Sequence, residues 1–264
     1  MSASTMDDGP MAGGPEEPRF AEPGGMARDT GKMAPTGPGG TARGGEEAAP
    51  AELGPVPESV PESGGTRIPR FVVLASGNGG NFQALSDACS SGKVRARMVA
   101  LVSDRKDALV LALAARASIP GLVLPAFTDI PRRGYDAALA ATVQAFRPDY
   151  VLLLGWMRML SSTFLERFPN RVINLHPALP GAFPGTQAIE RAYLAWKGGG
   201  ARRTGVMIHF VPDEGMDDGP LIATAEVDID DGDDLPALEK KIHAAEHALL
   251  VHTMARISAA PHEE

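Results

Sequence analysis

From residue 71 onward, short apolar runs alternate with longer segments that carry apolar residues at helical spacing, and this alternation constrains the fold more than any other feature of the chain. Short apolar runs bounded by glycine and proline are typical of strands that are buried on both faces. Strands that alternate with helices form a mainly parallel sheet with helices packed on both sides. The sequence therefore predicts an α/β fold, a mainly parallel doubly wound sheet with a Rossmann-like N-terminal half.

The second half of the pattern is less regular than the first. An acidic turn separates the last two predicted strands, and a long amphipathic helix with proline in its first turn follows them. The predicted strands are 71–75, 97–103, 121–125, 149–155, 171–175, 205–211 and 220–229, and the predicted helices are 82–92, 107–117, 134–146, 186–199 and 235–257.

Residues 1–66 differ in composition from the rest of the chain. This segment contains 14 glycines and 10 prolines but one aromatic residue, so it cannot bury enough apolar surface to offset its conformational entropy. Its 4 basic and 11 acidic residues hold −7 of the net charge of −8. We therefore predict a disordered, acidic Gly/Pro-rich extension over 1–66, a single folded domain over 67–258 and a flexible C-terminus over 259–264.

Charge, hydropathy and cysteine content narrow the class of protein. The folded part is nearly neutral and lacks the basic bias expected of a nucleic-acid-binding protein. No apolar run approaches the roughly 20 residues needed to cross a bilayer, and the first residues lack the apolar core of a secretory signal. The single cysteine, Cys89, excludes an internal disulfide. These features favour a cytoplasmic protein that has neither nucleic-acid nor membrane partners.

The sequence SGNGGN, residues 76–81, lies between the first predicted strand and the first predicted helix. Glycines at this position let the free N–H groups of a helix N-terminus approach an anion closely. A dinucleotide fingerprint would need a third glycine where Phe82 stands. The stretch therefore indicates a site for a single phosphate, with a tight structural turn as the alternative.

Asn174 and His176 lie two residues apart at the end of a predicted strand, in the stretch INLHPALPGAFPG. Residues two apart on an extended chain point to the same side. An amide donor beside an imidazole is suited to stabilising an oxyanion and to moving a proton at neutral pH. The alternative is a structural histidine with satisfied hydrogen bonds.

Two further stretches bear ionisable groups. The turn VPDEGMDDGP, residues 211–220, is either a solvated acidic loop or a magnesium site, although it lacks the alternating ligands of a hard-cation loop. The helical stretch HAAEH, residues 243–247, matches the H-x-x-E-H pattern of some zinc peptidases but has no evident third ligand. We therefore predict no metal site.

Taken together, five stretches resemble the phosphoribosylglycinamide formyltransferases, the folate-dependent glycinamide ribonucleotide transformylases of purine synthesis. The resemblance covers residues 70–257 and rests on VVLASGNGGNFQAL, DYVLLLGWMRML, INLHPALPGAFPG, GVMIHFVPDEGMDDGP and KKIHAAEHALL, in that order. It implies a formyltransferase-like catalytic domain that transfers the formyl group of 10-formyltetrahydrofolate to the amine of 5'-phosphoribosylglycinamide, with no metal.

The resemblance also implies roles for individual residues. It assigns catalysis to Asn174, His176 and Asp217. It assigns the ribotide to Gly79, Gly80, Asn81, Arg132 and Glu246, and the folate to Trp156, Met157, Arg158, Met159, Leu160 and Asp213. The chain departs from the usual family pattern at ALPGAFPG and at His243, both of which bear on ligand contacts.

The implied reaction assigns a task to each catalytic group. Attack of the neutral amine on the formyl carbon places negative charge on oxygen and positive charge on nitrogen. We expect Asn174 and a protonated His176 to donate to the oxygen. We expect Asp217 to favour the imidazolium and to relay the amine proton through water.

Three other functions compete with this interpretation. Methionyl-tRNA formyltransferase would need an appended tRNA-binding domain, and a formyltetrahydrofolate hydrolase would need a folded regulatory domain where residues 1–66 lie. A non-catalytic ribotide-binding protein would need the phosphate loop but not the three catalytic residues together. The pattern is compatible with either a monomer or a homodimer.

Overall fold

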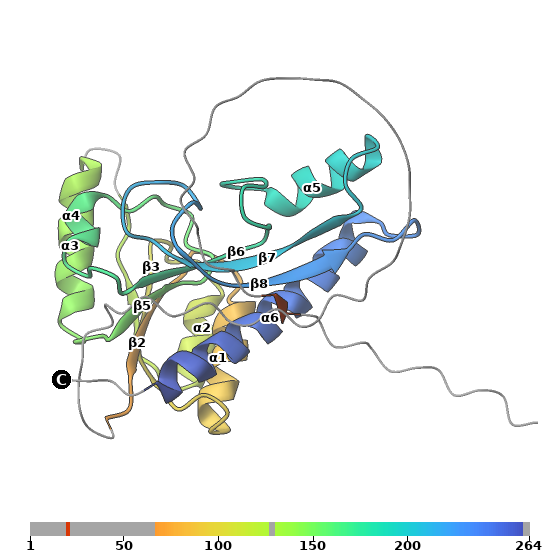
Figure 1. Cartoon of the computed structure of the whole chain (residues 1–264). Helices are drawn as coiled ribbons and strands as arrows, with labels where there is room; N and C mark the ends of the chain where they lie inside the picture. Colours follow the sequence, from red (N-terminus) through yellow and green to blue (C-terminus); the bar gives the residue numbers. More distant parts are fainter. Residues whose placement is uncertain (1–19, 22–66, 127–129, 261–264) are drawn as a thin grey trace, which may run out of the picture.

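A computed structural model describes residues 20–21, 67–126 and 130–260 of the chain (Figure 1). Its centre is a sheet in the order β1-β8-β7-β6-β5-β2-β3-β4. The strands are β1 (Phe20–Ala21), β2 (Arg70–Leu74), β3 (Arg97–Ser103), β4 (Gly121–Val123), β5 (Tyr150–Leu153), β6 (Val172–His176), β7 (Arg203–Phe210) and β8 (Leu221–Asp228). The helices are α1 (Gly80–Ser90), α2 (Val110–Arg116), α3 (Arg132–Gln144), α4 (Ser162–Leu165), α5 (Ala188–Lys197) and α6 (Leu235–Ala259).

The parallel half of the sheet confirms the predicted α/β fold. Strands β6, β5, β2, β3 and β4 are neighbours in that order and run parallel to one another. Strands β2 and β5 are almost wholly buried because helices cover both faces, which explains their uninterrupted apolar sequences. The other half, β7 and β8, is antiparallel.

Alternate residues of the central strand enter separate hydrophobic cores. Phe71 and Val73 belong to the core that also contains apolar side chains of α1, α2 and α6. Val72 and Leu74 belong to the core that contains side chains of α3 and α4. Figure 1 shows α1, α2 and α6 together on one side of the sheet, with α3 and α4 on the other.

Two short elements differ from the prediction. No helix was predicted at Ser162–Leu165, but α4 forms there. Its four residues are too few for a helical period to be visible in the sequence. Within the segment predicted to be disordered, Phe20–Ala21 pair with Ala225 and Thr224 of β8. An edge strand offers unpaired backbone N–H and C=O groups. A short segment can pair with these groups through its own backbone, so its side chains give little sign of the pairing.

The remaining predictions for the ends of the chain lie outside the described residues. Apart from Phe20–Ala21, this applies to all of 1–66. At the C-terminus, α6 continues to Ala259, and residues 261–264 lie outside the described ranges.

The strand order also determines where a ligand can lie. Strand β2 has β3 on one side and β5 on the other, so the chain reverses its direction of winding between β2 and β5. In open α/β sheets, ligands bind beyond the carboxyl ends of the strands at such a point. The loops that follow β2 and β5 meet there, because Ser76 N–H donates to the Gly155 carbonyl at 3.0 Å and Met157 N–H donates to Ser76 Oγ at 3.2 Å.

Candidate active site

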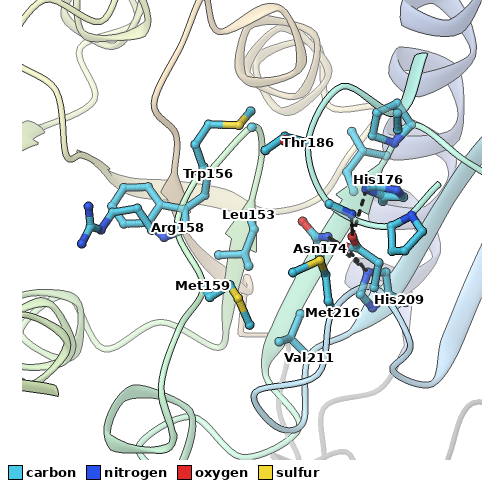
Figure 2. Close-up of a pocket in the computed structure, with 18 of the residues that line it drawn as sticks. Leu153, Trp156, Arg158, Met159, Asn174, His176, Thr186, His209, Val211 and Met216 are labelled. Atoms are coloured by element: carbon cyan, nitrogen blue, oxygen red, sulfur yellow. Dashed lines mark hydrogen bonds and ion pairs between the residues drawn. The ribbon is translucent and has the colours of Figure 1, made fainter. Parts of the chain in front are cut away.

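A cavity of about 760 Å³ lies at this edge of the sheet. Figure 2 shows apolar side chains such as Trp156 and Met159 on one side and the polar group of Asn174, His176 and His209 on the other. The cavity is lined by residues 155–160, 174–177, 184–188 and 213–217, together with Asn81, Leu153, Arg191, His209, Val211, His243 and Glu246.

Asp217 connects the polar side chains of the cavity. Its Oδ1 accepts a hydrogen bond from Asn174 Nδ2 at 2.9 Å and lies 3.5 Å from His209 Nε2. Its Oδ2 accepts from Gly185 N–H at 2.8 Å and lies 3.4 Å from His176 Nδ1. The structure therefore brings together the three predicted catalytic residues, although Asp217 lies on a loop after β7.

The surroundings of Asp217 keep its carboxylate ionised. Burial by itself would raise the pKa of this group, but the contact with His209, the hydrogen bond from Gly185 and the neighbouring His176 together lower the pKa below its usual value. Asp217 also adopts a positive φ of 55°, a conformation that Asp tolerates better than most residues. A fixed negative charge thus lies beside two imidazoles.

His176 is 5% exposed, and this burial affects its protonation. Burial lowers its pKa below 6.5 and outweighs the opposing effect of Asp217, so the ring is neutral at pH 7. Its Nε2 lies 3.1 Å from the carbonyl oxygen of Phe183, which can only accept, so this nitrogen carries the proton. The expected protonated His176 belongs to the charged intermediate, whereas in the substrate-free protein burial of the ring favours its neutral form.

His209 is a polar residue of the site that the sequence analysis missed. It is buried on β7, directly across from Asn174 of β6. Its Nδ1 lies 2.9 Å from the Phe210 carbonyl, so in the neutral ring Nε2 accepts from Asn174 Nδ2 at 3.2 Å. A histidine within the otherwise apolar stretch GVMIHFV was the available signal.

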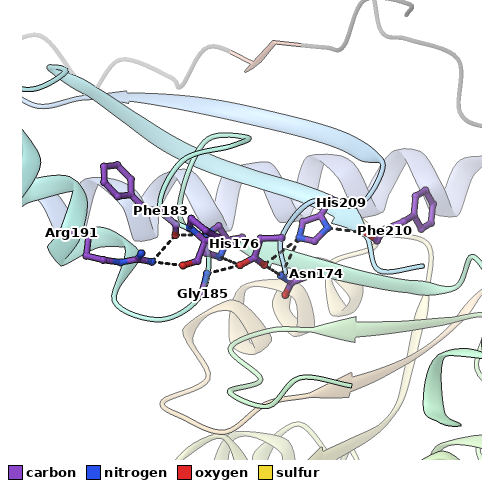
Figure 3. A network of polar contacts seen from close by, with 9 residues as sticks. Asn174, His176, Phe183, Gly185, Arg191, His209 and Phe210 are labelled. Carbon is purple, nitrogen blue, oxygen red and sulfur yellow. Dashed lines mark hydrogen bonds and ion pairs between the residues drawn. The ribbon is translucent and has the colours of Figure 1, made fainter. Parts of the chain in front are cut away.

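Asn174 is held from two sides by these contacts. Its amide nitrogen contacts both Asp217 and His209, and Figure 3 shows Asn174 beside His209. Both amide hydrogens therefore have protein acceptors here, and donation to an oxyanion requires one of them to change partner.

The stretch SGNGGN forms the N-terminus of α1. Gly79 is the N-cap with φ 83°, and a Cβ there would lie 2.7 Å from Val110. No side chain caps this end, so its first N–H groups are available to a ligand. Asn81 lines the cavity, whereas Gly79 and Gly80, the N-cap and the first residue of α1, are not among its lining residues.

Glu246 and His243 line the cavity from α6. Glu246 is buried and its Oε2 lies 2.7 Å from His243 Nδ1, an interaction that raises the pKa of His243. In the described residues, no group of three or more His, Cys, Asp or Glu side chains is arranged to hold a metal ion. The HAAEH stretch thus presents a carboxylate–imidazole pair to the cavity.

The residues predicted to bind folate form the apolar side of the cavity. All of 156–160 line it, between β5 and α4. Trp156 and Leu160 are buried, while Met157 and Met159 are 65% and 45% exposed. Such exposed, flexible methionines offer an adaptable surface to a flat ligand. The guanidinium of Arg158 lies 4.8 Å from the ring centre of Tyr135.

Asp213, predicted to contact the folate, lines the cavity, but Arg132, predicted to contact the ribotide, does not. Arg132 Nη2 lies 3.0 Å from Glu214, and its Nε lies 3.8 Å from Asp136. Glu214 in turn accepts from Ser162 N–H at 2.8 Å. Arg132 therefore bridges α3 and the acidic loop and does not lie with the glycines at the start of α1. The sequence did not reveal this position, because it depends on how the acidic loop folds.

Within the part of the chain that the structure describes, no helix has both the length and the apolar character needed to span a membrane.

Comparisons with known proteins agree with this architecture. Residues 69–254 match the formyl transferase family. Phosphoribosylglycinamide formyltransferase of Schizosaccharomyces pombe is 43% identical over 72% of this chain and 97% of its own length, and that of Mycobacterium tuberculosis (strain CDC 1551 / Oshkosh) is 40% identical over 72% and 85%. The crystal structure of glycinamide ribonucleotide transformylase 1 from Geobacillus kaustophilus is similar with a TM-score of 0.69, at 37% identity over 73% of this chain and all of that one. The chain therefore belongs to the formyl transferase family and, within it, to the phosphoribosylglycinamide formyltransferases.

Proposed function

We propose that this enzyme transfers the formyl group of 10-formyltetrahydrofolate to the amine of 5'-phosphoribosylglycinamide, which gives formylglycinamide ribonucleotide and tetrahydrofolate. The observation that carries the proposal is the position of Asp217, which lines the cavity and contacts Asn174, His176 and His209 there. One end of that cavity is apolar, and the other carries polar groups near a helix N-terminus.

The two ends of the cavity suit the two substrates. The ribotide has a phosphate, for which the free N–H groups at the start of α1 are a suitable site, and hydroxyls that Glu246 can accept from. The folate has a flat ring system, which the apolar stretch 156–160 and the loop at Asp213 can hold. The amine and the formyl carbon would then meet between the ends, at Asp217.

The neutral amine attacks the formyl carbon, a C–N bond forms, and the formyl oxygen becomes an oxyanion. Asn174 is the amide donor next to this position. We propose that one of its two N–H groups leaves His209 or Asp217 for the oxyanion when the substrates bind. Catalytic hydrogen bonds often reach their final partners only in the complex with substrate. A preorganised donor of this kind stabilises the intermediate more than it stabilises the substrate.

Neutral His176 is suited to accept the proton that the attacking nitrogen loses. Its Nε2 already carries a proton toward Phe183, so Nδ1 is the atom with a free lone pair, and Asp217 lies 3.4 Å from it. The imidazolium that forms is then stabilised at once by the carboxylate. Transfer of this proton to the departing folate nitrogen releases tetrahydrofolate and restores the neutral ring.

We further propose that the enzyme acts in the cytoplasm as a monomer or a homodimer. Analytical ultracentrifugation would distinguish the two oligomeric states.

The decisive experiment measures tetrahydrofolate released from 10-formyltetrahydrofolate, with and without phosphoribosylglycinamide. Product that depends on the ribotide supports the proposed transfer. Product formed without the ribotide indicates a hydrolase, and the absence of product under both conditions contradicts formyl-group chemistry altogether. An Asp217→Asn enzyme in the same assay controls for contaminating activity.

A further inference from the structure

The chain between β6 and α5 is held in an unusual backbone conformation. Phe183, Gly185 and Gln187 have φ values of 47°, 79° and 56°, all in the left-handed region. Glycine adopts this region freely, but a bulky residue such as Phe183 is strained there. Such strain persists only where surrounding contacts maintain it.

Arg191, on the first turns of α5, makes these contacts. Its Nη2 donates to the Phe183 carbonyl at 2.8 Å and to the Pro184 carbonyl at 2.5 Å, and its guanidinium lies 6.0 Å from the centre of the Phe183 ring. The two carbonyls are adjacent in the chain, so one planar group fixes the orientation of successive peptide units.

The same peptide units hold the catalytic pair. The Phe183 carbonyl that receives a hydrogen bond from Arg191 also accepts from His176 Nε2, at 3.1 Å. Two residues later, Gly185 N–H donates to Asp217 at 2.8 Å. Figure 3 shows the part of this path that runs from Arg191 through the Phe183 carbonyl to His176, with Gly185 nearby.

We propose that Arg191 is a positioning residue, which holds the strained 183–185 segment so that its carbonyl fixes the proton of His176 on Nε2 and its N–H holds Asp217. Nδ1 of His176 is thereby left as the proton acceptor. This role rests on the proposed function, because formyl transfer defines which orientation of His176 is productive.

The charge of Arg191 has a second effect on the same imidazole. Among the described residues, Arg191 forms no ion pair with a carboxylate, and its Nε is buried without a hydrogen-bond partner. The charged or titratable groups that act on His176 are Asp217, His209 and Arg191. Burial lowers the pKa of His176 most, Asp217 and the hydrogen bond to the Phe183 carbonyl raise it, and His209 and Arg191 lower it.

Three variants separate the effect of the Arg191 hydrogen bonds to the Phe183 and Pro184 carbonyls from the effect of its charge. Arg191→Met removes both, so we expect kcat to fall about tenfold to 100-fold, KM for both substrates to stay within about threefold, and the acid limb of the pH profile to move to higher pH. Arg191→Gln also removes the charge but keeps an amide donor, so it should show the same displacement of the limb with a smaller loss of kcat. Arg191→Lys keeps the charge, so its acid limb should coincide with that of the wild type while kcat is partly restored.

Lys197→Met is the matched control. Lys197 is a cation on the same helix, but it lies over Tyr193 and Trp196 and not against the 183–185 segment. This variant should retain the wild-type kcat and pH profile. An Arg191→Met enzyme with wild-type kcat and an unmoved acid limb would overturn the proposal. So would a raised KM for one substrate with kcat unchanged, which would identify Arg191 as a substrate-binding residue.

A spectroscopic measurement tests the same inference without turnover. Long-range 1H–15N spectra report the protonated nitrogen of each histidine ring, and a His176→Asn variant assigns the signals of His176. We expect the Nε2–H tautomer in the wild type and in Arg191→Lys, and a mixture of tautomers in Arg191→Met. An unchanged tautomer in Arg191→Met contradicts the positioning role. Lack of ribotide-dependent product from the wild type would instead contradict the proposed function, and the tautomer result would still stand by itself.

Discussion

Asn174 donates a hydrogen bond from its amide nitrogen to Asp217 Oδ1 at 2.9 Å, across 43 residues of sequence. The contact joins the end of β6 to the loop between β7 and β8. It fixes an amide, a carboxylate and, through the other carboxylate oxygen, an imidazole in one cavity.

Asn174→Ala removes the only amide side chain among the polar groups that contact Asp217 in the described structure. Loss of a single oxyanion donor costs roughly 100- to 1000-fold in kcat. We expect a loss of this size in steady-state assays, with little change in KM. A rate near that of the wild type would remove Asn174 from the proposed role.

Asp217→Asn keeps the shape of the side chain but removes its charge. The proton acquired by His176 would then lack its counter-charge, so we expect kcat to fall by about 100-fold or more. Asp218→Asn, one residue away on the exposed loop, is the matched control and should keep most of its activity. Equal losses in the two variants would show that the loop, and not the carboxylate at 217, is responsible.

The pH profile should reflect the lowered pKa of His176. Because transfer requires the neutral ring, activity should be constant near pH 7 and fall as the pH drops below 6.5, through the lowered folded-state value. In Asp217→Asn this limb should move to still lower pH, since the carboxylate opposes the effect of burial. The same group should make the fold less stable as pH falls below 6.5, because the unfolded chain then binds more protons. A limb that lies above pH 7 would contradict the neutral-imidazole assignment.

Glu246→Gln tests the ribotide end of the cavity. Charge-assisted hydrogen bonds contribute about 1.5–3 kcal/mol, so KM for the ribotide should rise about tenfold to 100-fold while KM for the folate stays the same. The variant should also lower the pKa of His243, which Glu246 raises through their hydrogen bond. Glu239→Gln, on the same helix but outside the cavity lining, serves as control. A selective effect on the folate would reverse the proposed orientation of the substrates.

Gly79→Ala and Gly92→Ala separate backbone strain from steric conflict. Both glycines have positive φ, of 83° and 78°, but a Cβ at Gly92 meets nothing within 4 Å, whereas one at Gly79 meets Val110 at 2.7 Å. Gly92→Ala should therefore cost roughly 1–2 kcal/mol, and Gly79→Ala more. Thermal unfolding measures both costs, and only Gly79→Ala should also raise KM for the ribotide. Equal costs would show that Val110 and its neighbours yield without penalty.

Much of this fold could be read from the sequence because the information is local. The strand and helix spacing predicts the parallel sheet, and residues two apart on one strand, such as Asn174 and His176, necessarily share a side. The glycines of 76–81 likewise predict a helix N-terminus open to an anion. The short helix α4 was missed because four residues contain too little periodicity.

Other features of the site were decided only by the tertiary structure, because they depend on contacts between segments that are distant in the sequence. The register of β6 against β7 places His209 opposite Asn174, and the closure of the acidic loop brings Asp217 to both while it draws Arg132 toward Glu214. The neutral state of His176 follows from burial, and the role assigned to Arg191 from two carbonyls that it reaches only in the folded chain. Spacing along a chain determines which side of its own strand a residue faces, but desolvation and pairing depend on what packs against it, and these neighbours come from elsewhere in the sequence.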